Sequence, residues 1–510
     1  MRSTGLILVV TAVLSWVFQH LGWRVPVFKA YTVLDDTLTP AFQFWQWGTF
    51  LRMLAIGGGI WLCLRPPQPP NPLTQKRWKR FKSIRRGYVS LMVLLGLTGL
   101  ALLDNLIVGK QALAVHYQGN WSFPFLNAQP IPGKTYGLSY EAETDYRELK
   151  RVFSANGAGT VLLPLVPYSA RLDTPPQSRT ITRLPDGMLH DDRKNQPFTG
   201  TAYTVFKDQP AQHRRDYRVR KGVFHGIASG FDPSGTLVER IEYADGKIIR
   251  EDRLGQEIDL SALATRESSG FRQVLYPPVS PSLSERHFLG TDSSGTDIMA
   301  VLYAGFQLQW AAAAFYTVFV FALAIALGCA MGYLGGTFDL LGQRVVEVWS
   351  ALPFLLIIVL IRSTVTPGIV VLVLVLAAFS WMGLSYNLRG ATYSERSRDY
   401  VAAARLLGAG NTRIIFQHIL PNILSILVTK LPFTVEGLIA SLTALDFLGF
   451  GLPPGEPSWG SLLKDGTDNM NAPWILYSAF AVIAVTLILI TFVGEAIREA
   501  FDPKRFTVYR

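Results

Sequence analysis

The segment that decides the fold spans residues 399–422 and reads DYVAAARLLGAGNTRIIFQHILPN. It is a polar, helix-breaking insert between two long apolar segments. Residues 398–405 can continue a helix, and Gly-Ala-Gly-Asn at 408–411 turns it, because Gly and Asn accept the left-handed backbone that ends helices. A second short helix is predicted for Thr412–Pro421, since proline cannot donate a backbone hydrogen bond. A helix-turn-helix on a membrane face, with small residues that allow close approach, indicates a docking element for another protein.

The composition indicates a polytopic membrane protein with a sizeable aqueous part. Of 510 residues, 49% are hydrophobic and 17% are charged. The net charge of +11 does not indicate nucleic-acid binding, because eight Lys and Arg with no acidic residue gather in residues 65–86. That pattern is typical of a cytoplasmic loop, with contact to anionic lipid or a partner as a second use. Cys63 and Cys329 lie in apolar segments, so neither a disulfide nor a metal site is predicted.

Eight segments satisfy the requirement of about 20 mostly apolar residues for a membrane-spanning helix. The first follows Arg2 and resembles a signal peptide, but no small-x-small cleavage site follows it, so a retained anchor is favoured. The eight segments lie near residues 4–20, 47–64, 88–108, 307–335, 349–363, 368–388, 422–445 and 473–497.

The placement of Lys and Arg predicts the orientation of these spans. The basic loop 65–87 is cytoplasmic, which puts both chain termini in the cytoplasm and residues 109–306 outside. The remaining loops alternate: 336–348 and 389–421 lie inside, and 364–367 and 446–472 lie outside.

Residues 109–306 differ in kind from the rest of the chain, because they are polar and contain no long apolar run. Units that begin at Gly200 and Gly226 repeat at 26 residues, as do Tyr217 and Tyr243. Alternating apolar and polar residues with Gly or Asp-Gly turns predict β-hairpins there. These units resemble MORN-type hairpin repeats. A plain antiparallel insert and a docking surface for a soluble partner both fit.

The sequence predicts no nucleotide site and no catalytic site in this chain. Gly133-Lys134-Thr135 has Ala128 where a Walker A motif needs glycine, and Pro130 and Pro132 remove amide donors from the loop. The segment is also predicted to lie outside the cell membrane, where ATP is not available. Any ATPase is therefore expected to be a separate chain.

Charged residues within the apolar segments are candidates for function, because burying a charge in a membrane is costly. Lys430 and Glu436 are the deepest, and six residues apart they do not share a helical face. Glu436 is either a residue of a transport path or an interhelical hydrogen-bonding group. Lys430 is expected to extend toward the cytoplasmic face.

Three motifs resemble the C-type permeases of peptide-type ATP-binding-cassette (ABC) importers. The first is the segment 399–421, called the coupling loop from here on. It resembles that family's EAA loop, although Ala402 replaces the family's Glu. By this resemblance the ATPase-coupling residues are Ala402, Ala403, Ala404, Arg405, Gly408, Leu420 and Pro421.

The second motif precedes the fourth apolar segment and reads HFLGTDSSGTD, similar to the family's HxLGTDxxGRD. His with two Asp allows a metal site, but the spacing is equally that of Asx-turns and helix N-caps, which is favoured. The matching residues are His287, Gly290, Thr291, Asp292, Gly295 and Asp297, and Thr296 stands where the family has Arg.

The third motif, LDFLGFGLPPG followed by PSWG, resembles the family's FLGxGxxPPxPSWG element. Asp446 stands where Ser is common, and Leu442 where an acidic residue is frequent. Asp446 is either a pore-facing group that attracts a cationic or N-terminal group, or a solvated helix cap. Motif residues are Gly449, Gly451, Pro453 and Pro454.

The resemblance implies a type I ABC importer permease core of about eight transmembrane helices with an inserted periplasmic β-rich domain, in the bacterial cytoplasmic (inner) membrane. The sequence of the third motif is most similar to the microcin C and oligopeptide branch of this permease family. The implied organisation is residues 1–64 as an extra N-terminal helix pair, 65–87 as a basic linker, 88–108 as the first core helix, 109–306 as the β-rich domain, 307–500 as the core with loop 389–421, and 501–510 as a cytoplasmic tail.

The resemblance also implies partners: a B-type permease in a heterodimer, ABC ATPase subunits, a periplasmic substrate-binding protein, a peptide substrate and membrane lipid. No cofactor is expected to bind this chain directly, because ATP is used by the ATPase. Two other classes are weighed. A secondary transporter would need coupling-ion sites and often inverted repeats, which the sequence does not show. A membrane-anchored periplasmic receptor or assembly factor would use residues 109–306 as its working part.

Overall fold

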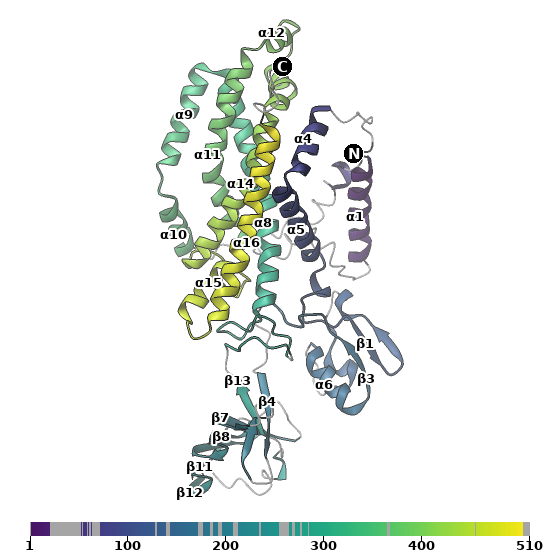
Figure 1. The fold of residues 1–510 in the computed structure, drawn as a ribbon, viewed down its shortest axis with the longest axis vertical. Coiled ribbons are helices and arrows are strands. Elements are labelled where there is room, and N and C mark those ends of the chain that lie inside the picture. Colours follow the sequence, from purple (N-terminus) through teal and green to yellow (C-terminus); the bar gives the residue numbers. More distant parts are fainter. Residues whose placement is uncertain are drawn as a thin grey trace. The chain divides into compact units, whose positions relative to one another are not determined.

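The computed structural model divides the chain into two compact units (Figure 1). The first unit comprises residues 1–173 and 280–510, and the second comprises residues 174–279. The structure describes residues 2–20, 53, 55–58, 60, 63, 72–127, 130–138, 143–171, 177–183, 187–191, 196–207, 213–233, 236–253, 265–267, 271–275, 278–283, 285–364, 368–453 and 455–502.

Apolar helices form most of the first unit, as the hydropathy of the sequence predicts. Counted over the described residues, four are long and apolar enough to span a membrane: α8 (Ile298–Leu334), α11 (Ile369–Arg396), the helix Asn411–Phe447 that includes α14 (Leu420–Phe447), and α16 (Pro473–Phe501). Two bent pairs raise that number to six if each is one span: α4 (Pro72–Ser83) with α5 (Arg85–Ala101), and α9 (Gly336–Ser350) with α10 (Phe354–Thr364).

The structure describes only part of the two N-terminal spans that the sequence predicts. The first corresponds to α1 (Arg2–His20), which contains the shorter apolar helix Leu8–Val17. The second, residues 47–64, lies almost entirely outside the described residues. The structure therefore supports a helical membrane protein with four to six described spans.

The predicted inside loop at residues 336–348 is wrong, because these residues form helix α9. The helix continues after a 66° bend into α10, and Pro353, which lacks an N–H group, lies at the break. Arg344 and Glu347 form a 2.6 Å ion pair on the surface of α9. These charges interrupt the apolar run in the sequence without interrupting the helix, since an i,i+3 pair stabilises it.

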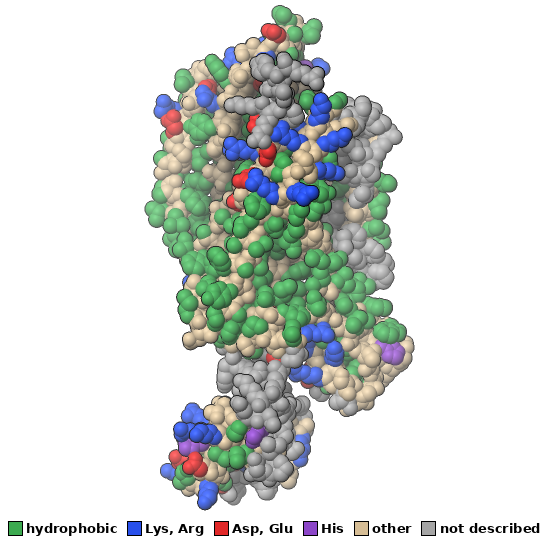
Figure 2. All heavy atoms as spheres, in the orientation of Figure 1, with side chains coloured by type: hydrophobic (Ala, Val, Ile, Leu, Met, Phe, Trp, Pro, Cys, Tyr) green, Lys and Arg blue, Asp and Glu red, His purple; other side chains and the backbone are tan. Residues whose placement is uncertain are grey.

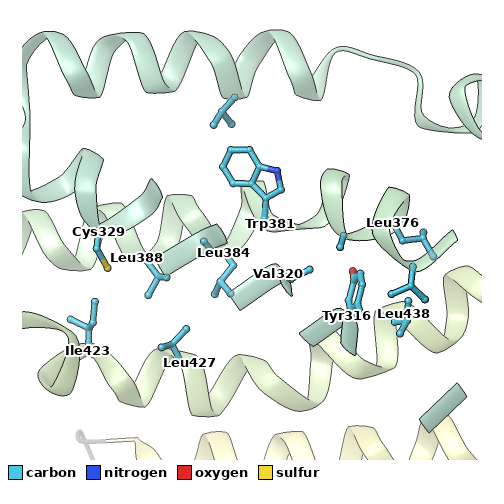
Figure 3. Packing of buried hydrophobic residues seen from close by; sticks show 14 of the residues in the cluster. Tyr316, Val320, Cys329, Leu376, Trp381, Leu384, Leu388, Ile423, Leu427 and Leu438 are labelled. Carbon is cyan, nitrogen blue, oxygen red and sulfur yellow. The ribbon is translucent and has the colours of Figure 1, made fainter. Parts of the chain in front are cut away.

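The main core lies where α8, α11 and α14 meet. Figure 3 shows Tyr316 and Val320 from α8, Leu384 from α11, and Leu427 and Leu438 from α14 directed into one apolar cluster. All five side chains are buried, so burial of their apolar surface holds the three helices together.

Glycines bring α8 and α11 into backbone contact. A Cβ atom on Gly328 would lie 2.6 Å from the carbonyl oxygen of Ser385, and one on Gly332 would lie 2.5 Å from that of Arg389. No larger side chain fits at either position without moving one helix. Small residues serve the same purpose at helix interfaces within membranes, where close packing stabilises association.

A second cluster joins α5, α8, α15 (Trp459–Asp468) and α16. Trp459 is fully buried and donates its indole N–H to the carbonyl oxygen of Leu302, 2.9 Å away. Gly87 of α5 packs directly against Ala496 of α16. The helix that precedes the β-rich insert is thus fixed to the last helix of the chain.

A small α/β element follows α5 within the first unit. Strands β1 (Ala114–Tyr117), β2 (Asn120–Ser122) and β3 (Gly159–Leu162) form an antiparallel sheet in the order β2-β1-β3. Helix α6 (Tyr146–Asn156) packs against this sheet through Leu149 and Phe153. Its N-cap is Asp145, whose carboxylate accepts the N–H group of Arg147 at 2.9 Å.

The second unit is one antiparallel sheet, as the alternating pattern predicts. The strand order is β12-β11-β10-β8-β7-β13-β4-β5-β6, with β9 paired to β8. The strands are β4 (Gln177–Arg183), β5 (Leu189–Asp191), β6 (Gln196–Pro197), β7 (Gly200–Val205), β8 (His213–Arg220), β9 (Val223–Phe224), β10 (Gly226–Phe231), β11 (Leu237–Ala244), β12 (Lys247–Arg253) and β13 (Phe271–Leu275).

The predicted hairpins and their turns are present in this sheet. Asp245 and Gly246, between β11 and β12, have φ of +48° and +81°, as a two-residue hairpin turn of type I′ requires. The 26-residue repeat places Tyr217 and Tyr243 close together, with ring centres 6.3 Å apart. Beside them, Arg215 bridges the carboxylates of Glu239 and Glu267.

The region predicted as a single insert, residues 109–306, contains two β-rich parts. Residues 109–173 belong to the first compact unit, and residues 174–279 form the second. Helix α8 begins at Ile298, nine residues before the predicted start, because the TDSSGTD turn already ends there.

Candidate functional site

The coupling loop begins with α12 (Asp399–Leu406), which ends in the turn that its glycine predicts. Gly408 has φ of +81°; its N–H group donates to the carbonyl oxygen of Arg405, and that of Ala409 donates to Ala404. This pair of bonds is the Schellman motif, which needs a left-handed residue after the helix. An L side chain at Gly408 is strained in this conformation, although open space surrounds it.

Helix α12 has one buried and one exposed side. Val401 and Ala404 are buried and pack into the main core. On the other side, Leu406 and Leu407 are 90% and 87% exposed. Ala402, Ala403, Arg405 and Gly408 are exposed as well.

Arg405 ties the loop to a membrane helix. Its Nε–H group donates to the phenol oxygen of Tyr333 on α8 at 3.1 Å, and its guanidinium lies 4.9 Å from the centre of that ring. The contact adds a cation–π interaction to a hydrogen bond.

The predicted end of the second helix at Pro421 is wrong. Residues 411–447 form one continuous helix made of α13 (Asn411–Arg413), a π-helical segment (Ile414–Ile419) and α14, in which Pro421 lies in the first turn. The N–H group of Leu420 donates to Ile415, five residues earlier. Proline is accepted within this continuous helix because the π-helical segment widens the turn just before it and displaces the regular i→i−4 hydrogen bonds there. Leu420 is partly buried and Pro421 is exposed.

Basic side chains gather at the end of the first unit that carries α4. Figure 2 shows Lys and Arg over α4 and the end of α16, beside a broad band of apolar side chains. In this part Arg389 of α11 forms two hydrogen bonds, of 2.5 and 2.6 Å, with the carboxylate of Asp339 on α9. Such a bidentate pair fixes the relative orientation of two helices.

The HFLGTDSSGTD motif builds the start of α8. Asp297 is its N-cap: Oδ1 accepts the N–H group of Ala300 at 2.9 Å, and Oδ2 lies 2.7 Å from Nδ1 of His287. Both side chains are completely buried. Gly290 and Gly295 have φ of +82° and +87°, so they provide the left-handed turns of the motif.

Asp292 organises the turn itself. One of its oxygens accepts the N–H groups of Ser294 and Thr296, at 2.9 and 2.8 Å. The neighbouring Ser293 donates both its N–H and its hydroxyl to Asp465 on α15. Burial, with a smaller contribution from the charge of Asp465, raises the pKa of the Asp292 carboxyl to about 6 against the opposing backbone donors.

Thr291 completes this motif, since it is 1% exposed and its carbonyl oxygen accepts the indole N–H of Trp474 at 3.3 Å. Among the described residues, no group of three or more His, Cys, Asp or Glu side chains is arranged to hold a metal ion.

Asp446 binds the loop that follows α14. Its side chain is 8% exposed; one oxygen accepts the N–H group of Leu452 at 2.7 Å and the other accepts the hydroxyl of Ser458 at 2.5 Å. A Cβ atom on Gly451 would collide with this carboxylate, and Gly449 has φ of +81°. Pro453 is half-buried, and Pro454 lies outside the residues that the structure describes. Asp446 is thus a buried organiser of the loop rather than a solvated cap.

Glu436 and Lys430 point to different sides of α14. Glu436 accepts the hydroxyl of Thr491 on α16 at 3.0 Å, which is an interhelical hydrogen bond. Lys430 is exposed on the side that faces α8 and α11.

The Gly133-Lys134-Thr135 segment forms a short 3₁₀ helix, η5 (Gly133–Tyr136), after which Gly137 is left-handed.

The comparisons with known proteins agree with the three motifs. Residues 324–507 match the family described as "binding-protein-dependent transport system inner membrane component". The Escherichia coli inner membrane ABC transporter permease protein YejE is 31% identical over 437 residues, which cover 85% of this chain and 98% of that protein. This chain belongs to that permease family. The family predicted from the sequence motifs is confirmed.

Two further relatives show which parts of the permease are shared. The peptidoglycan transport system permease protein YejE of Agrobacterium fabrum is 29% identical over 453 residues, or 89% of this chain and 99% of that protein. The oligopeptide transport system permease protein OppC of Haemophilus influenzae is 33% identical over 228 residues, or 44% of this chain and 72% of that protein. The longer matches are too long for the helical core alone, so they include much of the β-rich insert.

The sequence motifs did not identify several residues that contribute to the candidate site. Leu406 and Leu407 are visible in the sequence as two apolar residues inside a polar insert, and that is the signal that would find them. Tyr333 and Asp465 lie far from their partners in the sequence, and nothing local marks them.

Proposed function

We propose that this permease moves peptides or peptide-like substrates inward across the bacterial cytoplasmic membrane, driven by ATP hydrolysis in a separate chain. Its relatives are named for peptidoglycan and oligopeptide transport, which supports this substrate class. The proposal includes a B-type permease as its heterodimer partner, an ABC ATPase and a periplasmic substrate-binding protein. It also includes eight membrane crossings with both termini in the cytoplasm.

The observation that carries the coupling role is the exposed pair Leu406–Leu407 at the Gly408 turn. Leu406 and Leu407 each have about nine-tenths of their surface exposed, and as neighbours they form a small apolar surface at the turn. They lie at the end of a helix whose other side is buried in the core. We assign α12 and its turn as the surface on which the ATPase binds.

The mechanism follows from this attachment. When the ATPase subunits close on ATP, they displace α12, and the contacts of α12 with the core carry that displacement into the spanning helices. The nucleotide shifts the permease only by its preference between the two states. For the other assigned residues, Glu436 is proposed to join α14 and α16 beside the path, and Asp446 to order the outer loop at its end.

The test is co-purification of the ATPase with the tagged permease from cells that express the whole transporter. Four forms are compared: native, Gly408→Asp, the double variant Leu406→Ser with Leu407→Ser, and Leu283→Ser. Leu283 is the control, because it is an 81% exposed leucine in the segment before α8, away from the coupling loop.

Both loop variants should reach the membrane in native amounts but lose the ATPase and peptide uptake. Leu283→Ser should keep both. Recovery of equal amounts of ATPase with the loop variants and the native permease would overturn the coupling assignment. Uptake of no peptide by the native transporter would overturn the substrate class.

A further inference from the structure

A polar cavity opens among the helices of the core, at a place the coupling role does not use. It has a volume of about 300 Å³ and lies between α8, α11 and α14. Its lining includes Tyr316 from α8, Ser380 and Asn387 from α11, and Lys430 and Thr434 from α14. So many polar groups in apolar spanning helices mark a surface that faces water or a partner rather than lipid.

Two helices each present one continuous face to this cavity. Its α11 residues, Ser380 to Asn387, are spaced i, i+3, i+4 and i+7, and so are its α14 residues, Lys430 to Gly437. That spacing keeps the side chains on one side of a helix. A Cβ atom on Gly383 or Gly437 would meet no atom within 4 Å, so the face has free space in front of it.

Lys430 provides the positive charge of this face, in the cytoplasmic half of the predicted span. In the predicted span 422–445 it lies eight residues from the cytoplasmic end and 15 residues from the outer end, or about 12 and 22 Å along the helix at 1.5 Å per residue. Its side chain lines the cavity between the three helices. Within the described part of the chain, Lys430 is in no ion pair, and the acidic groups of its own helix, Glu436 and Asp446, bind Thr491 and the outer loop.

Among the neighbouring polar groups, the Asn387 amide keeps one N–H group for an anion, whereas the hydroxyl protons of Ser380 and Thr434 are already used. Ser380 and Thr434 donate their hydroxyls to carbonyl oxygens of their own helices, at 2.7 and 3.1 Å, and Asn387 does the same with its amide at 2.9 Å. A lone ammonium in an apolar span is costly unless an anionic group meets it. The cavity therefore suits an anion that arrives during function.

We propose that Lys430 binds a carboxylate of the transported peptide as it passes this cavity. The inference rests on the proposed function, because a peptide with a free C-terminus carries such a group. A lipid headgroup carries its charge at the membrane surface, about 12 Å along the helix from Lys430, whereas a transported peptide passes the cavity itself. Lys430 then acts as a specificity residue on the path, and the second amide N–H of Asn387 in the same cavity can donate to the bound group.

The test measures uptake of two peptides that differ in one group, by the complete transporter in vesicles. One peptide has a free C-terminal carboxylate, and the other is its C-terminal amide. The acid-to-amide ratio of uptake is compared among the native permease, Lys430→Met, Lys430→Arg and Leu431→Met. Comparing ratios cancels any preference of the binding protein, which is the same in all four samples.

We expect Lys430→Met to reduce the acid-to-amide ratio about tenfold or more, since a hydrogen bond to a charged group contributes about 1.5–3 kcal/mol. Lys430→Arg should keep most of the preference. Leu431→Met, a neighbouring exposed residue outside the cavity lining, should leave the ratio unchanged.

Three results would overturn the inference while peptide transport itself stands. The first is an acid-to-amide uptake ratio of one for the native permease, and the second is an unchanged ratio in Lys430→Met. The third is an equal loss of uptake of both peptides in Lys430→Met, together with loss of the partner permease on purification. The last would show that Lys430 pairs the two permeases. Failure of the native transporter to take up either peptide would instead contradict the proposed function.

Discussion

Arg405 of the coupling helix donates a hydrogen bond to Tyr333 at the end of a membrane-spanning helix, and its guanidinium lies over the same aromatic ring. Tyr333 is 3% exposed, whereas Arg405 is exposed. The pair thus joins a fixed group of the core to a group on the surface that we assign to the ATPase.

Arg405→Ala should lower the number of peptides transported per ATP hydrolysed, because one attachment of α12 to α8 is lost. The free energy of unfolding of the permease should fall by about 1 kcal/mol or less, which is the contribution of an exposed cation–π pair. Transport and ATP hydrolysis measured together in vesicles give the ratio. Arg413→Ala is the control, since Arg413 contacts Gln417 on its own helix; a similar loss in both variants would contradict this role of Arg405.

Gly408→Ala should open the α12 turn, whereas Gly410→Ala should not. Gly408 is left-handed at φ +81° and Gly410 has φ of −71°, and both have open space for a Cβ atom. A left-handed L residue costs about 1–2 kcal/mol. Hydrogen exchange of the amides at 405–410 should therefore quicken by about 5- to 30-fold in the first variant. Equal exchange in the two variants would show that the turn tolerates a side chain.

Asp297→Ala should destabilise the start of α8 more than Asp297→Asn. The alanine variant loses the N-cap, which contributes about 1 kcal/mol, and leaves the buried His287 without its carboxylate. Asparagine still caps the helix. Thermal midpoints of the purified permease in detergent measure the difference, and equal midpoints for the two variants would mean that the cap contributes nothing.

Stability should depend on pH through Asp292. Its pKa of about 6 in the folded protein exceeds its ordinary value of 3.8, so the folded chain binds this proton more tightly than the unfolded chain does. The contribution of Asp292 to stability therefore falls as pH rises from about 4 to about 6, and it is level above that window.

Asp292→Asn should raise the thermal midpoint at pH 7, and this gain should shrink as the pH falls below about 6. Asparagine keeps an oxygen for the N–H groups of Ser294 and Thr296 while removing the charge near Asp465. Midpoints measured from pH 4 to pH 8 on both forms test this. A gain that is the same at every pH would show that the charge of Asp292 is not responsible.

The sequence predicted those features that depend on local chemistry. Gly408, the Asp245–Gly246 turn and the cap at Asp297 each follow from conformations that few residue types adopt. It failed where a residue has two uses. Pro421 was expected to end a helix, but it fits the first turn after a π-helical segment. Charges in α9 suggested a loop, but they pair along one helix.

The candidate site also depends on contacts that no local pattern reveals. Lys430 could be recognised in the sequence as a charge in a span, but its neighbours Ser380 and Asn387 come from another helix. The same holds for Asp465 and Ser293, which lie 172 residues apart. Such pairs depend on how the helices pack, and packing follows from complementary surfaces along whole helices.

The glycine contacts between α8 and α11 have a mechanical consequence. Because the backbones touch at Gly328 and Gly332, no layer of flexible side chains separates the two helices, and they behave as one stiff lever. Two of the attachments of α12 lead into these helices: Arg405 reaches α8, and the two-residue link at 397–398 leads back to α11. We therefore expect a displacement of the loop to move α8 and α11 together.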